Sequence, residues 1–142
     1  MRDVKVFVDS DVVISSLLSD KGAAHFILNK QSSKSIISNV SKVELERVSD
    51  RLGISGGKLQ DLIKNKFKVI KLSADLPKIK SDFQIYASDV NDAHIVAGAK
   101  QAKAKFLLTY NIRYFRREKI KNGLNIVVLT PAQYLQYLRS LK

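Results

Sequence analysis

Five short apolar runs, separated by segments with helical periodicity, are the feature that most restricts the fold of this chain. The runs favour β-structure and are bounded by polar or turn-forming residues, as strands usually are. Strands that alternate with helices form a parallel sheet with right-handed crossovers. The sequence therefore predicts a three-layer α/β/α fold with a central parallel sheet of about five strands. The predicted strands span residues 4–8, 34–38, 67–72, 105–109 and 124–129.

Helical patterns occupy segments between these runs, and the expected organisation is a single domain over residues 1–142. The segment 92–103 is rich in Ala and Gly, so its helix can lie close to the sheet. The last helix has strong start signals, with Thr130 as N-cap and Pro131 as first helical residue. Its apolar residues cover more than one side, which predicts a homodimer or another partner contact. The other helices are expected over residues 12–18 continuing through 22–30, 41–51 and 57–66.

The predicted strands differ in how apolar they are. The first, fourth and fifth are the richest in apolar residues, so we expect them to be central or well covered. The third alternates with Lys68 and Lys71 and is expected in a more exposed position.

The composition restricts the class of protein. The 45% of hydrophobic and 27% of charged residues are ordinary for a globular protein. No apolar stretch approaches the roughly 18 residues that span a bilayer, and the N-terminus runs into the first predicted strand without a secretory signal. Cysteine is absent, which excludes disulfides and thiolate metal sites. We expect a cytoplasmic protein with no membrane association.

The charge is less ordinary. Twenty-five Lys and Arg against thirteen Asp and Glu give a net charge of +12. A domain this basic commonly binds nucleic acid or an acidic partner, although surface lysines also serve solubility. The basic residues are bunched, and we expect RNA binding by two clusters beside the acidic edge described next. Their residues are Arg113, Arg116, Arg117, Lys100 and Lys103.

Polar side chains stand where strands meet helices. Asp9 follows the first predicted strand, Glu44 lies one turn into the helix after the second, and Asp92 and Asn111 flank the fourth. Because the carboxyl ends of parallel strands share one edge, we expect these groups to lie together, with Asp11 close to Asp9. Clustered carboxylates need a cation, and oxygen ligands suit Mg²⁺ or Mn²⁺. With the basic surface, this predicts nuclease chemistry.

The same residues also have structural explanations. Either aspartate of Asp9-Ser10-Asp11 can cap the following helix. Glu44 completes an S-x-x-E capping box with Ser41. Asp92 can interact with a helix dipole, and Asn111 can serve as a turn residue. The two histidines have no spacing that indicates a metal pair.

Two segments resemble the motifs of PIN domains. VFVDSDVVISSLLS is similar to the opening of these domains, and DAHIVAGAKQAKAKFLLTYNIRYF to their third and fourth motifs. The stretch Ser41-Lys42-Val43-Glu44 fits the middle motif. PIN domains are metal-dependent ribonucleases, and short stand-alone members are typically toxins of virulence-associated-protein-C-type toxin–antitoxin pairs. The resemblance therefore implies an endoribonuclease of a type II pair, with an RNA substrate and an antitoxin partner.

The resemblance also implies roles for individual residues. Asp9, Glu44 and Asp92 match the three core acids, and Asn111 falls at the fourth acidic position. Asp11 stands where Asn is commonest in the family, so it is expected to add charge to the metal site. Apart from the resemblance, Ser10 and Thr109 flank the site and are expected to hydrogen-bond a carboxylate or the scissile phosphate, and Asp89 is expected as a neighbouring carboxylate in the loop before Asp92.

Two alternatives remain at this stage. One is a degenerate PIN fold that only binds RNA or protein, which the amide at Asn111 favours. The other is a haloacid-dehalogenase-like phosphatase, in which Asp9 is the nucleophile and Asp11 the acid of a D-x-D motif. That chemistry also requires an acidic pair after an apolar strand, and the residues before Asp89 and Asp92 make a poor strand.

Overall fold

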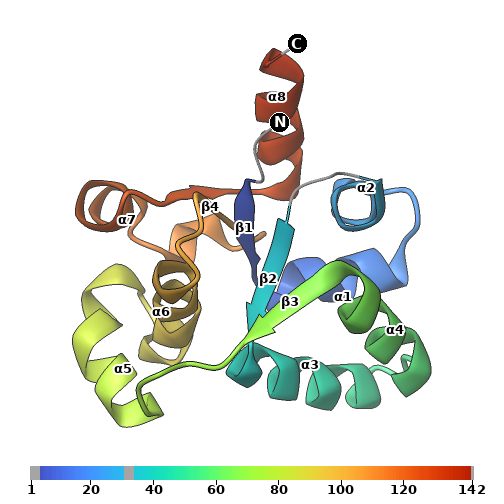
Figure 1. The fold of residues 1–142 in the computed structure, drawn as a ribbon, viewed down its shortest axis with the longest axis horizontal. Coiled ribbons are helices and arrows are strands. Elements are labelled where there is room, and N and C mark those ends of the chain that lie inside the picture. Colours follow the sequence, from blue (N-terminus) through green and yellow to red (C-terminus); the bar gives the residue numbers. More distant parts are fainter. Residues whose placement is uncertain (1–3, 31–33, 142) are drawn as a thin grey trace.

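The computed structural model describes residues 4–30 and 34–141, and a sheet of five parallel strands lies at its centre (Figure 1). The strand order is β3-β2-β1-β4-β5, and every neighbouring pair is parallel. The predicted fold class is confirmed. The strands are β1 (Lys5–Val8), β2 (Lys34–Ser38), β3 (Phe67–Ile70), β4 (Phe106–Leu108) and β5 (Val127–Leu129).

The position of each strand follows its burial only in part. β1 is the middle strand, and Val6, Phe7 and Val8 have no exposed surface. β3 is an edge strand with exposed residues at its centre, as expected. β5 is also an edge strand, so it is not central, but it is covered as the alternative in the prediction expected, with Val128 only 4% exposed. Its apolar residues are explained by contacts with the two helices that flank it in sequence.

Eight α-helices and three short 3-10 helices lie within the described residues. They are α1 (Ser10–Leu18), α2 (Ala23–Lys30), α3 (Asn39–Arg51), α4 (Gly56–Lys66), α5 (Leu76–Phe83), α6 (Ala93–Gln101), α7 (Arg117–Leu124), α8 (Pro131–Ser140), η1 (Gln84–Tyr86), η2 (Val90–Asp92) and η3 (Ile112–Tyr114). In the described part of the chain, none of the helices has the length and apolar character needed to cross a membrane.

The helices differ from the prediction in two respects. The expected continuous helix over 12–18 and 22–30 is two helices, because Ser19 adopts an extended conformation after α1. Helices α5 and α7 were not predicted. Each buries a single side chain, Ile79 in α5 and Ile120 in α7, so neither carries a clear apolar periodicity.

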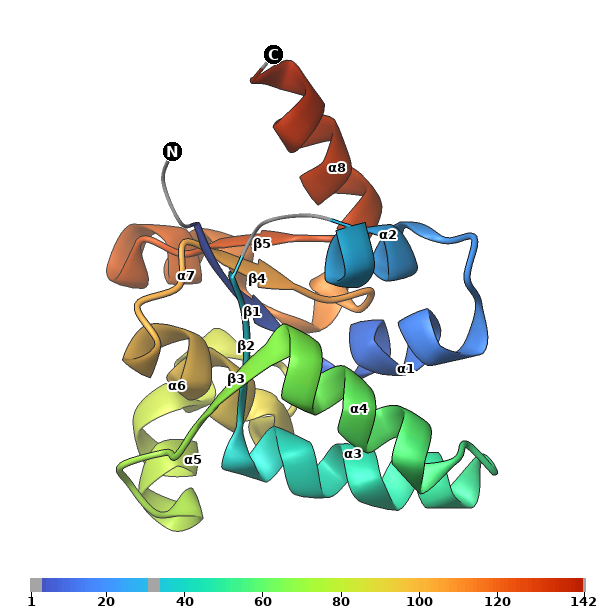
Figure 2. The same cartoon turned by 45° about the vertical axis from the view of Figure 1, so that its right-hand side comes forward.

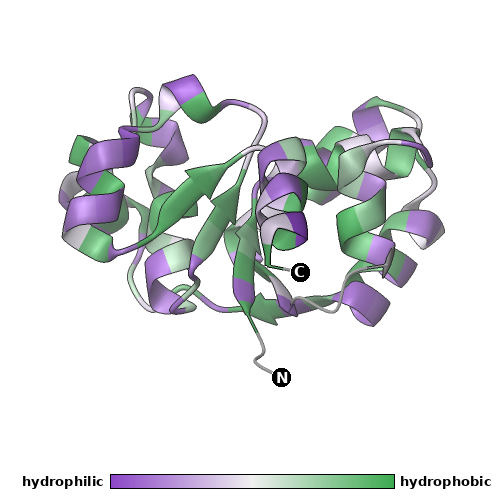
Figure 3. Ribbon diagram, turned by 90° about the horizontal axis from the view of Figure 1, so that it is seen from above, coloured by the Kyte–Doolittle hydropathy of each residue, from purple (hydrophilic) through white to green (hydrophobic). Residues whose placement is uncertain are grey.

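The sheet separates two apolar layers. Val6 and Val8 of β1 pack with α1, α2, α3, α4 and α8, whereas Phe7 packs with α6, α7 and β5. This division follows from the alternation of side chains along a strand. Figure 2 shows the helices on the two sides of the sheet. Figure 3 shows hydrophobic residues concentrated in the strands, with hydrophilic residues on the outward helical turns.

Helix α6 lies very close to the sheet, as its composition predicts. A Cβ atom at Gly98 would overlap the ring of Phe7, with 2.8 Å to Cε1. The missing side chain therefore sets the distance between α6 and β1. Since α6 begins immediately after Asp92, this packing also positions that carboxylate.

Helix α8 begins as predicted. Thr130 is its N-cap and Pro131 its first residue, and a capping box joins Thr130 to Gln133. Tyr134 is fully buried, with its ring centroid 5.2 Å from that of Phe106. The far end of the helix stands clear of the sheet in both Figure 1 and Figure 2, and Leu141 is exposed.

Candidate functional site

The chain changes direction across the sheet between β1 and β4. From β1 it continues through β2 to β3 on one side, then returns to β4 and β5 on the other. In open α/β sheets, ligands bind outside the carboxyl ends of the strands at such a switch point. Asp9 directly follows β1 and Thr109 directly follows β4, so both residues lie at this crevice.

Asp9 is held by the end of β4 and by the first residue of α1. Its backbone N–H donates to the Leu108 carbonyl at 2.9 Å. Its carboxylate Oδ1 accepts from the Ser10 backbone N–H at 2.7 Å, and Oδ2 accepts from the Thr109 hydroxyl at 2.8 Å. Asp9 is also the N-cap of α1, so the capping explanation holds together with a place in the site. Only 8% of the residue is exposed.

Thr109 organises the second aspartate. Its Oγ1 lies 3.4 Å from Asp11 Oδ2 and accepts from the Asn111 backbone N–H at 3.1 Å. Asp11 Oδ2 also accepts from the Tyr110 backbone N–H at 3.0 Å. The other oxygen, Asp11 Oδ1, is buried and has no hydrogen-bond partner in the described part of the chain. One carboxylate oxygen is thus fixed and the other is left available.

Glu44 reaches the site from α3. Its Oε1 accepts from the Ser10 hydroxyl at 2.8 Å, which joins α3 to the start of α1. The predicted capping box with Ser41 is wrong, because α3 begins earlier, at Asn39. Ser38 is the N-cap, and its Oγ accepts from the Ser41 backbone N–H at 3.1 Å. Glu44 is therefore in the second turn, and capping does not explain it.

Asp92 and Asp89 lie at the two ends of η2. Asp89 caps η2 by accepting from the Asn91 backbone N–H at 2.9 Å, and its side chain is exposed. Asp92 ends η2 and precedes α6, where its carboxylate makes no capping hydrogen bond. The structure therefore separates the two: Asp89 is a local cap, and Asp92 belongs to the cavity described next.

A cavity of about 380 Å³ collects these groups from five separate elements and connections. Its polar lining is Asp9, Ser10, Asp11, Glu44, Asp92 and Asn111. Its apolar lining is Ile14, Val48, Ile95 and Phe115. No Lys, Arg or His is among the lining residues. The shared edge expected from the sequence is thus observed for the four acids and for Asn111.

Burial and mutual repulsion disfavour the ionised forms of the aspartates in this cavity. Burial, together with the charge of Asp11, raises the pKa of Asp9 to about 8, against the lowering effect of its hydrogen bonds from Thr109 and Ser10. Burial raises the pKa of Asp11. Burial and the charges of Asp89, Glu44 and Asp11 raise the pKa of Asp92. A positive charge placed here would therefore be strongly attracted.

The donor set suits a hard divalent cation. All the polar side-chain donors are oxygen atoms except the Asn111 amide nitrogen, and the buried Asp11 Oδ1 has an unused lone pair. Within residues 4–30 and 34–141, no three His, Asp or Glu side chains converge closely enough to enclose an ion. An ion would accordingly take one or two carboxylates and complete its shell with water, which is how Mg²⁺ is usually bound.

The basic residues divide between the two ends of the sheet. Arg113 lies in η3 just after Asn111, and Arg117 begins α7. The Arg116 guanidinium donates to the Ile85 carbonyl at 3.1 Å, so it also ties this loop to η1. Lys100 and Lys103 instead lie at the end of α6, before β4 begins, which is the opposite edge from Asp9. Their expected position beside the acids is therefore wrong.

Sequence reasoning missed the apolar wall and one neighbour of the site. Val48 lies one helical turn after Glu44, and that spacing was the available signal for a shared face. His94 follows Asp92 on α6 and is buried, and burial lowers the pKa of its imidazole. Its Nδ1 has no hydrogen-bond partner among the residues that the structure describes.

A family model described as PIN domain matches residues 5–113. The chain belongs to the PIN-domain family. This confirms the resemblance of the opening segment and of the later segment from Asp92 as far as Arg113. The match also argues against the phosphatase alternative. Asp89 caps a 3-10 helix that ends at Asp92, so the two acids do not follow a strand as that chemistry requires. A comparison with curated proteins gave no match.

Solved structures with the same fold include toxin–antitoxin assemblies. One is a toxin–antitoxin complex from Klebsiella pneumoniae, with a TM-score of 0.65 and 20% identity over 89% of this chain and 97% of that one. Another is VapBC2 from Rickettsia felis bound to a promoter DNA fragment. Its TM-score is 0.59, with 15% identity over 89% of this chain and 98% of that one. A third is VapC20 from Mycobacterium tuberculosis, described as a sarcin-ricin loop cleaving toxin. Its TM-score is 0.54, with 15% identity over 72% of this chain and 86% of that one. At these identities the likeness establishes the fold of this PIN domain.

Proposed function

We propose that this PIN domain is a Mg²⁺- or Mn²⁺-dependent endoribonuclease and the toxin of a type II toxin–antitoxin pair, with residues 1–142 forming a single domain. One observation carries the proposal: Asp9, Asp11, Glu44 and Asp92 line one cavity with no basic side chain among its lining residues. Uncompensated buried carboxylates reduce folding stability. Cation binding explains why a chain would maintain them.

The site residues have distinct roles in this proposal. A divalent ion would supply an activated water and offset the charge on the phosphoryl oxygens. Asp9, Asp11, Glu44 and Asp92 are its candidate ligands, with the Asn111 amide oxygen beside them. The catalytic set is Asp9, Glu44, Asp92 and Asn111.

Two hydroxyl groups orient the ligands before any ion arrives. The Thr109 hydroxyl holds Asp9 Oδ2 at 2.8 Å, and the Ser10 hydroxyl holds Glu44 Oε1 at 2.8 Å. The second oxygen of Asp9, Oδ1, accepts from the Ser10 backbone N–H at 2.7 Å. Ser10 and Thr109 would therefore fix the carboxylate planes, and we propose this supporting role for both.

RNA is the substrate class that the surroundings of the cavity favour. Arg113 and Arg117 follow Asn111 in the chain and can bind phosphates. Tyr110 and Tyr114 are 43% and 51% exposed, and aromatic side chains at such positions can stack on single-stranded bases. This combination suits a flexible strand laid over the carboxyl edge of the sheet.

Cleavage of a labelled RNA in the presence of Mn²⁺ tests the proposal. The wild-type protein should cleave, EDTA should stop it, and Asp92→Asn should abolish cleavage without unfolding the protein. Asp50→Asn changes an exposed acid of α3 and is the matched control, which should stay active. If the wild-type protein binds RNA but does not cleave it with Mn²⁺, the degenerate PIN fold is correct and the nuclease assignment fails.

Two partners belong to the proposal. Toxin–antitoxin complexes among the compared structures support a cognate antitoxin, and the apolar residues on more than one side of α8 support a homodimer through that helix. Expression of the chain alone in a bacterial host should arrest growth, and Asp92→Asn should relieve the arrest. Light scattering measures the dimer directly, and a monomeric mass at the concentrations used for cleavage would rule it out as the active form.

A further inference from the structure

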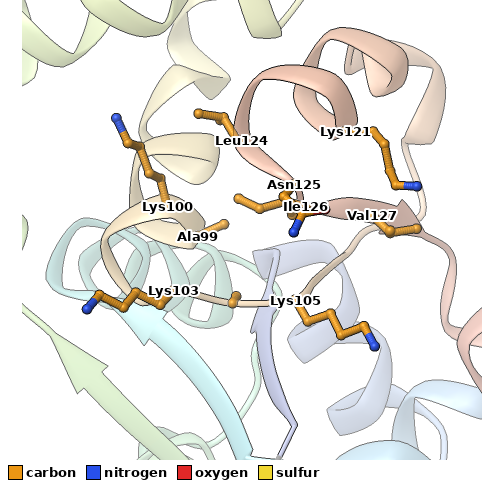
Figure 4. Close-up of a pocket in the computed structure, with 10 residues that line it drawn as sticks. Ala99, Lys100, Lys103, Lys105, Lys121, Leu124, Asn125, Ile126 and Val127 are labelled. Atoms are coloured by element: carbon orange, nitrogen blue, oxygen red, sulfur yellow. The ribbon is translucent and has the colours of Figure 1, made fainter.

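A second cavity, of about 550 Å³, lies at the amino edge of the sheet, opposite the acids (Figure 4). It is formed by the end of α6, the residues before β4 and the connection from α7 to β5. Lys100, Lys103, Lys105 and Lys121 line it, and we refer to it as the lysine pocket. No Asp or Glu is among the lining residues.

The four ammonium groups are separate and unneutralised. Figure 4 shows their nitrogens spread around the rim rather than gathered at one point. The ion pair found among the described residues, Lys78–Asp82, involves none of them. Two are held by aromatic side chains instead. Lys100 Nζ lies 5.7 Å from the Phe83 centroid, and Lys105 Nζ lies 5.6 Å from the Phe106 centroid and donates to the Tyr137 hydroxyl at 3.5 Å. Such contacts leave the charge available to an anion.

The backbone of the pocket supplies an independent observation. Lys103 and Asn125 both adopt left-handed conformations, with φ of 56° and 58°. Both follow the ends of helices, where Gly or Asn is usual. Asn125 obeys that rule and Lys103 does not. A lysine kept in an unfavourable conformation at the rim of a basic cavity points to a use for its side chain.

The chain segment between the acidic edge and this pocket is rich in basic residues. The chain leaves Asn111 at the carboxyl edge and returns to Asn125 at the amino edge through η3 and α7. It carries Arg113 at its start and Lys121 near its end, with Glu118 as its one acid. The two ends are separated by at least the length of β4, on the order of 10 Å. A strand of a few nucleotides spans that distance.

We propose that the lysine pocket is a second phosphate-binding subsite, which holds the backbone of the RNA strand whose cleaved bond lies at the acidic edge. The inference rests on the proposed ribonuclease function. Separated ammonium groups match the repeated charges of a nucleic-acid strand better than they match one small anion. The basic segment from Arg113 to Lys121 favours RNA over an acidic protein segment, because it starts next to the proposed cleavage site.

Binding of a labelled oligouridylate of about 12 nucleotides tests the inference, a length within the site sizes of single-strand-binding domains. Fluorescence anisotropy in EDTA measures affinity without cleavage. The pocket variant is Lys103→Asn with Lys121→Gln, in which Asn suits the left-handed backbone, so the melting temperature should not fall. The matched control is Lys64→Gln with Lys68→Gln, which removes two exposed charges from α4 and β3.

Two lost phosphate contacts should reduce the log–log salt slope by about 1.4 and raise Kd about 25-fold near 0.1 M salt, from about 0.7 per contact. The control should keep the wild-type slope. Equal losses of RNA affinity in both variants would show a bulk charge effect. A pocket variant with the wild-type Kd and salt slope would show that these lysines do not contact the RNA. Either result overturns the subsite, as does tighter binding of polyglutamate than of RNA.

The two proposals fail separately. If the pocket variant binds RNA more weakly than the control but the wild-type protein does not cleave RNA with Mn²⁺, the subsite stands and the nuclease fails. If the wild-type protein cleaves RNA and the pocket variant binds as the wild type does, the nuclease stands and the subsite fails.

Discussion

Asp9→Asn removes the charge from a carboxylate that the fold buries, and the resulting change in stability has a defined pH dependence. An Asn side chain can keep both hydrogen bonds. Its oxygen accepts from the Ser10 N–H, and its amide can donate to Thr109 Oγ1 once that hydroxyl turns. The substitution therefore changes little except the charge, and we expect the metal-free variant to be more stable than the wild-type protein at alkaline pH.

The magnitude follows from the raised pKa. Burial and the neighbouring Asp11 move the pKa of Asp9 from 3.8 to about 8 in the folded protein. Stability from this group is fully present below pH 3.8 and is lost as the pH rises toward 8, because only the unfolded chain ionises freely in that range. At 1.36 kcal/mol per pH unit, the loss is at most about 6 kcal/mol. That corresponds to about 18 °C in Tm at roughly 3 °C per kcal/mol.

Thermal unfolding in EDTA over a pH series measures the effect. The advantage of Asp9→Asn should be greatest above pH 8 and shrink toward zero near pH 4. Adding Mn²⁺ at alkaline pH should stabilise the wild-type protein and not the variant. The exposed control Asp50→Asn should show neither effect. A stability difference that is independent of pH, or a variant less stable at alkaline pH, would refute the electrostatic reasoning.

Three further substitutions test the site and its support. Glu44→Gln should cost well under about 1 kcal/mol of folding stability, since an amide oxygen still accepts the hydroxyl bond, while RNA cleavage collapses. A fully active variant would exclude a ligand role. Asn111→Asp should tighten Mn²⁺ binding by calorimetry, because it adds charge to the cation site, and an unchanged affinity would mean that the side chain does not face the ion. Gly98→Ala should destabilise by about 1–3 kcal/mol in chemical denaturation, because its Cβ overlaps the Phe7 ring. Gly56→Ala, with open space around it, should not.

Local patterns located most of the elements, whereas the order of strands depends on pairing between distant segments. The apolar run ending at Val8 is recognisable as a buried strand without any tertiary information. The edge position of β5 is not recognisable in this way, because the flanking helices contact the strand and Val128 is buried like a residue of a central strand. Helix α5 had usable signals that the apolar pattern hid, with Asp75 as N-cap and Pro77 in the first turn.

The site was predictable where it depends on strand ends and unpredictable where it depends on helix geometry. Asp9 follows a strand, so its edge is set by topology. The Ser10–Glu44 hydrogen bond depends on where α3 starts, which the sequence pattern placed at Ser41 and the structure places at Asn39. Lys100 is eight residues from Asp92, but a helix of that length carries the chain roughly 12 Å, to the other end of the sheet.

The hydrogen bond between Asp9 and Thr109 joins residues 100 positions apart, and this has a consequence for synthesis of the chain. β1 is the first of the five strands to leave the ribosome, but its neighbour β4 is the fourth. At about 5–20 residues per second, the interval between the two residues lasts roughly 5–20 s. During that time the first aspartates have neither Thr109 nor Asn111 beside them. Translation that stops anywhere before Thr109 should therefore release only inert fragments, whatever the finished protein does to RNA.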